Sequence, residues 1–263
     1  MTNSRPDASS PDEARIVEAG IVEDRVLGGR VRLLQPKAGY RAGMDAALLA
    51  AACDAEPGER VLDLGCGAGA ALLAAAVRRP GARFTGVERD PEVLALARRS
   101  IALNDLGERV EALAGDVGAG FAALKLKPFD AVFCNPPFFD DPGALRAPRP
   151  DRAHAYMAEG GLGAWTAFLL KAVREGGGIT LIHRADRLAD ILALLSPKAG
   201  SFQIRPIAPF ADRPAKRVLV RAIKTGKAPL RLLPPLVLHD RSGAQHTPEA
   251  EAILRGEGAL DWG

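Results

Sequence analysis

The sequence has few cysteines and histidines and no long apolar run. Its three cysteines, Cys53, Cys66 and Cys134, include no Cys-x-x-Cys pair, so neither a disulfide framework nor a zinc site is expected. Of the four histidines, His183, His239 and His246 show no ligand spacing, and we expect no metal. No stretch approaches about 18 uninterrupted apolar residues, and the start of the chain is too polar for a signal peptide. We therefore expect a protein of the reducing cytoplasm that is neither exported nor embedded in a membrane.

Two segments nearly lack charge of one sign, although the net charge is only +3. Residues 203–231 contain eight basic residues and one acidic residue, whereas residues 1–24 contain six acidic and two basic residues. A run of like charges most simply forms a solvated face. The alternative is that the basic segment binds a polyanion, such as a nucleic acid.

The rest of the composition is typical of a globular protein. Of the 263 residues, 48% are hydrophobic and 25% are charged, which suffices for a full-sized core. We expect a polar, flexible tail over residues 1–20, a hairpin and a helix over residues 21–55 that pack on the core, and the main domain over residues 56–263. Asp45 is expected to cap the helix of the second part.

Strand-like and helix-like segments alternate in the main domain. The expected strands lie at residues 61–64, 83–88, 110–115, 129–135 and 177–184. Helical patterns lie between them, including WTAFLLKAVREG directly before the last of these strands. This alternation predicts an α/β fold with a doubly wound, mostly parallel sheet. Two further β-rich runs, SFQIRPIAPF and RVLVRAIK, have no helix between them, so we predict a seven-stranded sheet whose last strand is antiparallel.

A glycine-rich turn, DLGCGAGA, follows the first of these strands and opens a helix. Gly65 and Gly67, which follow Asp63, would let a ligand approach the backbone where a Cβ would block it. Glu88 ends the next strand, where a carboxylate can accept both ribose hydroxyl groups of a nucleoside. The same spacing fits the dinucleotide fingerprint, so the glycines alone do not decide between two cofactors.

A second acidic residue follows the third strand, in the stretch AGDV. Asp116, with Val117 after it, would lie at the carboxyl edge of the sheet, where it can accept from the amino group of an adenine. The simpler interpretation is that Glu88 and Asp116 cap helices or lie in hydrated loops. Their positions relative to the glycine turn favour nucleoside binding.

The stretch NPPF ends the fourth strand. Pro136 and Pro137 have fixed φ angles and no N–H, so the turn is stiff and its carbonyl groups point in set directions. The side-chain oxygen of Asn135 and the carbonyl of Pro136 can accept two N–H bonds of a planar amine, while Phe138 stacks on its ring. With a sulfonium methyl group in line, positioning and electrostatics suffice without a metal. For an isolated motif, a turn with Phe138 in the core is the alternative.

VLDLGCGAG, GVERD, AGDV and NPPF, in this order, resemble the motifs of class I S-adenosylmethionine-dependent methyltransferases. Further segments, RVRLLQPKAGYRAGMDAALLAAA, RAHAY, PFADRPAKRVLVRA and ILRGEGAL, are similar to those of bacterial tRNA1(Val) adenine-N6 methyltransferases. The resemblance covers the chain from about residue 22 to its end. It implies S-adenosylmethionine as the cofactor and an adenine in a tRNA anticodon loop as the acceptor. Tyrosine is commoner in the family at the position of Phe138, which keeps the stacking ring but lacks the hydroxyl.

The resemblance also implies the residues of the site. The cofactor would be bound by Tyr40, Arg41, Gly43, Asp63, Gly65, Gly67, Glu88, Asp116, Val117 and Asn135. The catalytic turn would consist of Asn135, Pro136, Pro137 and Phe138. The tRNA would be bound by the segment from Arg205 to Arg231 and by Arg146, Arg149 and Arg152.

Two rival functions share parts of this pattern. A protein methyltransferase that acts on a glutamine amide can use the same Asn-Pro-Pro turn, but it carries a helical N-terminal domain for which the roughly 60 residues before the glycine turn leave no room. A small-molecule O-methyltransferase normally needs a metal cluster or a base near the hydroxyl group, and neither is evident. Methylation of an RNA adenine is therefore the first hypothesis.

Overall fold

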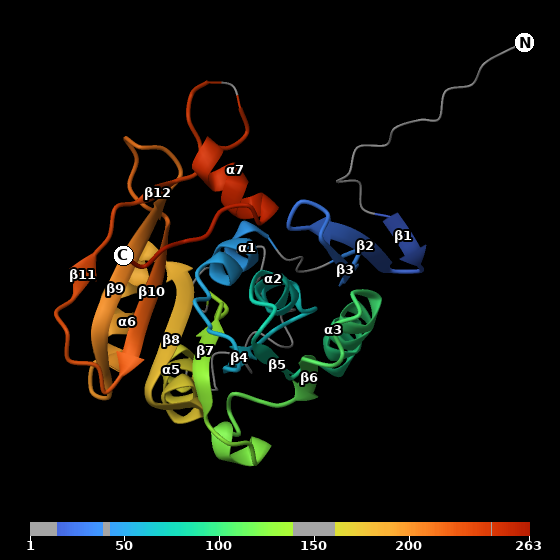
Figure 1. Cartoon of the computed structure of the whole chain (residues 1–263), viewed down its shortest axis with the longest axis horizontal. Coiled ribbons are helices and arrows are strands. Elements are labelled where there is room, and N and C mark those ends of the chain that lie inside the picture. The colour runs from blue at the N-terminus through green and yellow to red at the C-terminus, as the bar shows by residue number, and fades with distance from the viewer. Residues whose placement is uncertain (1–14, 39–42, 139–160, 243) are drawn as a thin grey trace, which may run out of the picture.

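A nine-stranded sheet forms the centre of the computed structural model, which describes residues 15–38, 43–138, 161–242 and 244–263. The strands follow the order β11-β9-β10-β8-β7-β4-β5-β6, with β12 also paired to β9 (Figure 1). Their bounds are β4 (Arg60–Leu64), β5 (Arg83–Glu88), β6 (Val110–Ala114), β7 (Phe129–Cys134), β8 (Val173–Arg184), β9 (Ala199–Ala208), β10 (Arg217–Lys224), β11 (Arg231–Leu232) and β12 (Leu236–Val237).

The pairing of these strands is mostly parallel. β4 pairs in parallel with both β5 and β7. β5 pairs in parallel with β6, and β7 pairs in parallel with β8. β10 runs antiparallel to both β8 and β9. The predicted doubly wound, mostly parallel sheet with an antiparallel last strand is therefore confirmed. The seven long strands are extended at the β9 edge by β11 and β12, which have two residues each.

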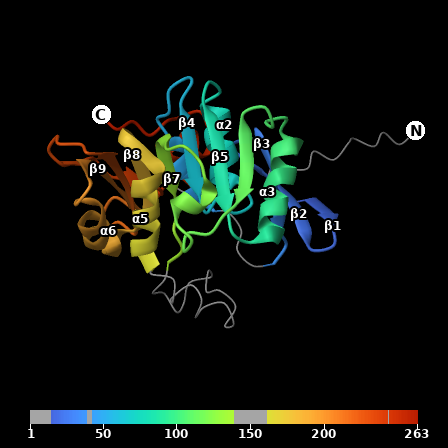
Figure 2. The ribbon, with the colours of Figure 1, turned by 90° about the horizontal axis from the view of Figure 1, so that it is seen from below.

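Helices cover both faces of the sheet (Figures 1 and 2). α1 (Met44–Ala51), α2 (Ala70–Arg78) and α3 (Pro91–Leu103) pack on one face, and α5 (Gly161–Ala172) and α6 (Leu188–Leu195) pack on the other. Successive residues of a strand point to opposite faces. Val61 accordingly joins the core beneath α1 to α3, whereas Leu62 joins the core beneath α5 and α6. The interior strands are buried on both faces, which explains their continuous apolar runs.

A separate three-stranded antiparallel sheet lies at the β6 side of the domain (Figure 2). Its strands are β1 (Arg15–Glu18), β2 (Ile21–Val26) and β3 (Val31–Pro36). Hydrogen bonds join β3 to α3: the backbone N–H of Leu34 donates to Ser100 Oγ at 2.9 Å, and that of Arg32 donates to Asn104 Oδ1 at 2.9 Å. This sheet is thereby fixed to the core, while the expected part boundaries after residues 20 and 55 stay predictions.

The C-terminal segment returns to α1 after the short helix α7 (Pro248–Arg255). The indole N–H of Trp262 donates to the carbonyl of Ala52 at 2.9 Å, and the backbone N–H of Leu260 donates to the carbonyl of Ala51 at 3.2 Å. Trp262 is only 6% exposed. These residues satisfy carbonyl groups at the end of α1 that have no partner inside the helix. Two 3-10 helices, η1 (Phe121–Leu124) and η2 (Ala185–Arg187), complete the fold.

Two local predictions are wrong. Asp45 does not cap α1: Gly43 is the N-cap residue, no side chain caps the helix, and Asp45 lies in the first turn. The helix expected up to Gly176 ends at Ala172, where β8 begins. Val173 pairs with Phe129 of β7 and is fully buried. Pairing and burial of this β-branched residue outweigh the helical pattern of the surrounding sequence.

Among the described residues, no helix is long and apolar enough to cross a membrane. The same part of the chain contains no group of three or more His, Cys, Asp or Glu side chains placed to hold a metal ion. All three cysteines are buried as free thiols.

Candidate active site

The turn between β4 and α2 is built from glycines with positive φ angles. Gly65 has a φ of 72° and Gly67 a φ of 58°, a region that other residues seldom adopt. The Cα of Gly65 lies against Trp165 of α5, and a Cβ at this position would be 2.8 Å from Trp165 Cζ3. At Gly67, by contrast, a Cβ would meet no heavy atom within 4 Å. The turn is closed on one side by Trp165 and open at Gly67, as a backbone that receives a ligand requires.

Glu88 joins this turn to the next one along the sheet edge. Its carboxylate accepts the backbone N–H of Gly67 at 3.0 Å and those of Arg89 and Asp90 at 2.8 Å each. Gly67 belongs to the turn after β4, while Arg89 and Asp90 follow β5. Glu88 therefore holds two neighbouring turns in place, in addition to the ribose contact expected from the sequence. That contact stays a prediction.

Asp63 is buried beneath the glycine turn. Asp63 belongs to β4 and is 2% exposed. Its Oδ2 atom has no hydrogen-bond partner within the described residues. Burial, followed by the nearby charge of Glu88, raises the pKa of Asp63 well above its usual range. An unsatisfied buried carboxyl is costly unless a ligand completes it. The ammonium group of S-adenosylmethionine has the charge that would stabilise its ionised form, so this donor fits the residues present.

Asp116 and Val117 follow β6 at the same edge. The backbone N–H of Gly115 donates to the carbonyl of Glu88 at 3.1 Å, which places the start of this loop beside the end of β5. The carboxylate of Asp116 accepts the N–H of Gly118 at 2.9 Å and lies 3.9 Å from the guanidinium of Arg89. Asp116 remains partly exposed and can accept a further hydrogen bond. Its contact with an adenine stays a prediction.

The NPPF turn directly follows β7, next to the glycine turn. β7 pairs with β4 so that Cys134 lies opposite Leu64, which brings Asn135 level with Gly65. Pro136 is buried, whereas Asn135 and Phe138 are half-buried. The structure therefore places the expected acceptor turn at the same edge as the expected cofactor turn, where ligands of doubly wound proteins bind.

Phe138 contacts two side chains that were not expected at the NPPF turn: His183, for which no role was predicted, and Arg217, which was expected only as part of the tRNA-binding segment. The ring of His183, at the end of β8, meets it edge-on with 5.1 Å between ring centroids, and the guanidinium carbon of Arg217 lies 4.7 Å from the Phe138 centroid. Arg217 also bonds Asp45 of α1 at 3.1 Å. Burial, with the positive charge of Arg187 adding, lowers the pKa of His183 to about 4, so its imidazole is neutral at pH 7.

The residues that the sequence did not place at the site are brought there by elements far apart in the chain. Trp165, His183 and Arg217 come from α5, β8 and β10, and each reaches the site only because the sheet is assembled in its observed strand order. A histidine at the end of a predicted parallel strand, as in LIHR, is the one sequence signal that could have pointed to His183, since that position lies at the ligand edge.

Several expected site residues lie outside the described residues: Tyr40, Arg41, Arg146, Arg149 and Arg152. Gly43 is described and lies at the start of α1, with extended backbone angles. The roles expected for all of them stay predictions.

Most cations of the basic segment are engaged within the molecule. Ion pairs join Arg217 to Asp45 at 3.1 Å, Arg221 to Asp54 at 2.6 Å and Lys224 to Glu175 at 3.1 Å. Arg205 and Arg231 donate to main-chain carbonyl groups of the last three residues. Within the part of the chain that the structure describes, Arg213, Lys216 and Lys227 form no ion pair. The segment is thus mainly a set of structural contacts, with few cations available to a polyanion.

Known proteins share this architecture. Residues 55–198 match the family model described as "Methyltransferase domain". A tRNA1(Val) (adenine(37)-N6)-methyltransferase of Yersinia enterocolitica is 32% identical over 177 residues, which are 67% of this chain and 69% of that protein. A release factor glutamine methyltransferase of Chlorobaculum tepidum is 29% identical over 167 residues, which are 60% of this chain and 56% of that protein. This chain therefore spans little more than half the length of the glutamine methyltransferase.

A solved structure gives the same result for the fold. The crystal structure of a protein described as a predicted O-methyltransferase, from Agrobacterium tumefaciens, is 31% identical and superposes with a TM-score of 0.68 over 82% of this chain and 98% of that one. The family match covers more than half of the chain, and the strand order and the glycine turn agree with it. The chain belongs to the methyltransferase-domain family and is an S-adenosylmethionine-dependent methyltransferase.

Proposed function

We propose that this methyltransferase acts on N6 of an adenine in a tRNA anticodon loop. The observation that supports the proposal most is the position of the NPPF turn, which the pairing of β7 with β4 holds beside the glycine turn. Relatives from Yersinia enterocolitica and Porphyromonas gingivalis that are named tRNA1(Val) (adenine(37)-N6)-methyltransferases align with 69% and 72% of their length. The segments of the chain outside the core resemble the same enzymes.

Three residues of the turn, Asn135, Pro136 and Phe138, have distinct tasks in this proposal. The side-chain oxygen of Asn135 and the carbonyl of Pro136 accept the two N–H bonds of the adenine amine, which localises its nitrogen lone pair. Phe138, held by His183 and Arg217, stacks on the base and so stabilises it outside its own stack by about 1–3 kcal/mol. Bound S-adenosylmethionine supplies a methyl group on a positively charged sulfur, which is a good leaving group. The N–CH₃ bond forms as the S–CH₃ bond breaks, and the alkylated nitrogen, now cationic and acidic, releases a proton to water, so the turn needs no strong base.

The first alternative is methylation of a glutamine amide. An amide presents the same planar NH₂ group to the turn, and several relatives are named release factor glutamine methyltransferases. The second alternative is transfer to an oxygen of a small molecule, in line with the name of the Agrobacterium structure. For that reaction the described residues around Phe138 offer His183, which is neutral and buried.

Transfer of labelled methyl groups to three acceptors separates these functions. The acceptors are tRNA without modifications, a release-factor peptide that contains the glutamine, and a catechol. We expect label in the tRNA alone, at N6 of one adenine. Label in the peptide or the catechol, with an inert tRNA, would replace this proposal by the corresponding alternative.

Asn135→Ala tests the role of the turn in the same assay. We expect it to abolish methyl transfer, because one of the two acceptors for the amine is lost. Cofactor affinity, measured by calorimetry, is expected to fall much less than turnover, because the variant loses one expected cofactor contact while the glycine turn and Glu88 are intact. Unchanged turnover in the variant would show that Asn135 does not bind the acceptor amine.

A further inference from the structure

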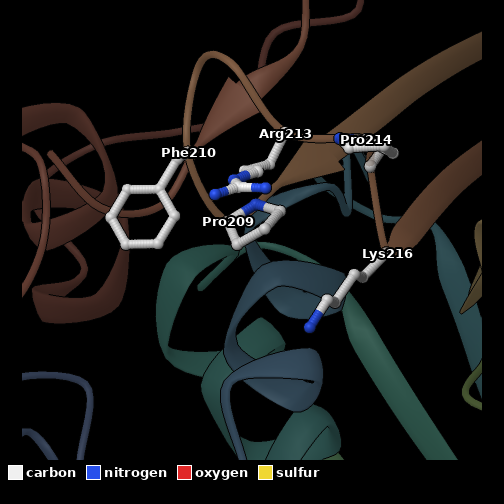
Figure 3. A pocket seen from close by; sticks show the side chains of 6 residues that line it. Pro209, Phe210, Arg213, Pro214 and Lys216 are labelled. Carbon is white, nitrogen blue, oxygen red and sulfur yellow. The ribbon is translucent and has the colours of Figure 1, made fainter.

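A hollow of about 450 Å³ lies at the loop that joins β9 to β10. It is lined by Pro209, Phe210, Arg213, Pro214, Ala215 and Lys216 (Figure 3). Arg213 and Lys216 are the two cations of this lining, and its other four residues are apolar. Because β10 is antiparallel to β8, this loop lies at the carboxyl edge of the sheet, the edge that also carries the glycine turn and NPPF.

The hollow carries positive charge that the described residues do not neutralise. Arg213 and Lys216 are exposed and form no ion pair with any described residue. The acidic residue of the loop, Asp212, is instead paired with Arg241 at 2.8 Å. In Figure 3 the guanidinium of Arg213 extends over Pro209 towards Phe210, whereas the ammonium of Lys216 reaches towards α1. Two cations therefore flank an apolar wall without an internal partner.

The hollow also adjoins the acceptor turn. The carbonyl of Lys216 accepts the backbone N–H of Ala185 at 3.2 Å, which fixes the end of the loop beside β8. The next residue, Arg217, contacts the ring of Phe138. A cation of the hollow, Lys216, is thus the chain neighbour of the arginine that contacts the ring proposed to stack on the acceptor base.

We propose that Arg213 and Lys216 form a subsite for the phosphodiester of a nucleotide next to the methylated base, with Phe210 as the wall for its sugar or base. The inference rests on the proposed action on tRNA. An arginine fork and a lysine ammonium together suit a phosphate, which accepts several charge-assisted hydrogen bonds. In RNA the nucleotides beside the target base always carry this charge. The backbone of a peptide, by contrast, carries no charge next to a reacting glutamine amide.

The test compares a double variant with a matched control. Arg213→Ala with Lys216→Ala removes both cations of the subsite. Lys127→Ala with Lys198→Ala removes two exposed cations at the opposite edge of the sheet, before β7 and β9, which form no ion pair among the described residues. Thermal unfolding and cofactor binding are measured for both, so that loss of folding is recognised separately from loss of a contact.

Binding of each protein to an anticodon stem-loop is measured between 50 and 200 mM salt. A plot of log affinity against log salt has a negative slope, and each lost contact with a single-stranded phosphate makes this slope shallower by about 0.7. The subsite contacts one phosphodiester, so we expect the affinity of the wild type to fall about 2.6-fold more over this range than that of the subsite variant. The control variant is expected to keep the wild-type slope.

A modified RNA assigns the effect to the linkages beside the target base. In this RNA the two linkages that flank the target adenine are uncharged methylphosphonates. We expect the modification to lower the slope of the wild type and of the control, and to leave that of the subsite variant unchanged. If the wild type methylates the RNA but the subsite variant keeps the wild-type slope, the subsite alone is refuted. The same holds if the RNA is methylated and methylphosphonates affect all three proteins equally. An RNA that the wild type does not methylate refutes the proposed function and the subsite together.

Discussion

Gly65 and Gly67 form a natural pair for a quantitative test of the glycine turn. Both have a positive φ, so an alanine at either position costs about 1–2 kcal/mol of strain. A methyl group at Gly65 would also press on the indole of Trp165, and such overpacking adds about 1–3 kcal/mol. At Gly67 the space is open. We expect Gly65→Ala to lower the free energy of unfolding by about 2–5 kcal/mol and Gly67→Ala by about 1–2 kcal/mol.

Urea unfolding, followed by circular dichroism, measures both losses. The contribution of the indole is isolated by Trp165→Phe, which removes the outer ring that a methyl group at Gly65 would meet. In a double-mutant cycle, Gly65→Ala is expected to cost about 1–3 kcal/mol less in the Trp165→Phe background than in the wild type. Equal losses for the two alanine variants, or no coupling between Gly65 and Trp165, would contradict this account of the turn.

The same pair separates stability from cofactor binding. The methyl group of Gly67→Ala would point into open space where the backbone is accessible, so it would obstruct a ligand rather than the fold. We expect this variant to stay folded and to bind S-adenosylmethionine at least about tenfold more weakly, which corresponds to about 1.4 kcal/mol. Isothermal titration calorimetry measures the affinity. A folded Gly67→Ala protein with wild-type affinity would show that the ligand does not approach this residue.

Two further predictions concern pH. The pKa of His183 is lowered from about 6.5 to about 4 in the folded protein, so the unfolded chain binds more protons between these pH values and the free energy of unfolding falls as the pH drops through them. At pH 5 this loss is about 2 kcal/mol. Urea unfolding at pH 7 and pH 5 should show the loss in the wild type, and His183→Phe should lack this contribution. The pKa of Asp63 is raised in the folded protein, and a cationic ligand favours its ionised form, so affinity for S-adenosylmethionine should rise with pH up to that pKa in the wild type and be weaker and independent of pH in Asp63→Asn. In the ligand-free protein the free energy of unfolding of the wild type falls as the pH rises from the ordinary pKa of an aspartate to the raised pKa of Asp63, because the unfolded chain then binds fewer protons than the folded one. Asp63→Asn lacks this loss. Identical pH profiles for a variant and the wild type, in either experiment, would refute the corresponding assignment.

The elements that local sequence patterns determine were predicted well. Short apolar runs and the turns after them gave the parallel strands, and the missing helix between the last two long strands gave the antiparallel one. The two local predictions that failed concern positions where a distant segment decides the outcome. The α5–β8 boundary depends on the pairing of Val173 with Phe129, and Asp45 bonds Arg217, which is 172 residues away.

The basic segment shows the same limitation for the candidate site. Its charge was evident from the sequence, but its partners, Asp54 and Glu175 among them, are separated from it by tens to more than a hundred residues. Only the folded chain shows which cations are neutralised. The expected site residues Asp63, Gly65, Glu88 and Asn135 do gather at one edge of the sheet, because the ends of parallel strands meet there. Their contacts with ligands stay predictions.

The bond from Trp262 to Ala52 joins residues 210 positions apart in the chain. On a ribosome, α1 emerges long before the tryptophan that covers its last turn has been synthesised. Until then the final carbonyl groups of α1 face water, and the apolar side chains around them are partly exposed to solvent. Contacts of such long sequence separation form late and slow the final step of folding. The final residues therefore determine when the first helix of the domain becomes part of a completed core.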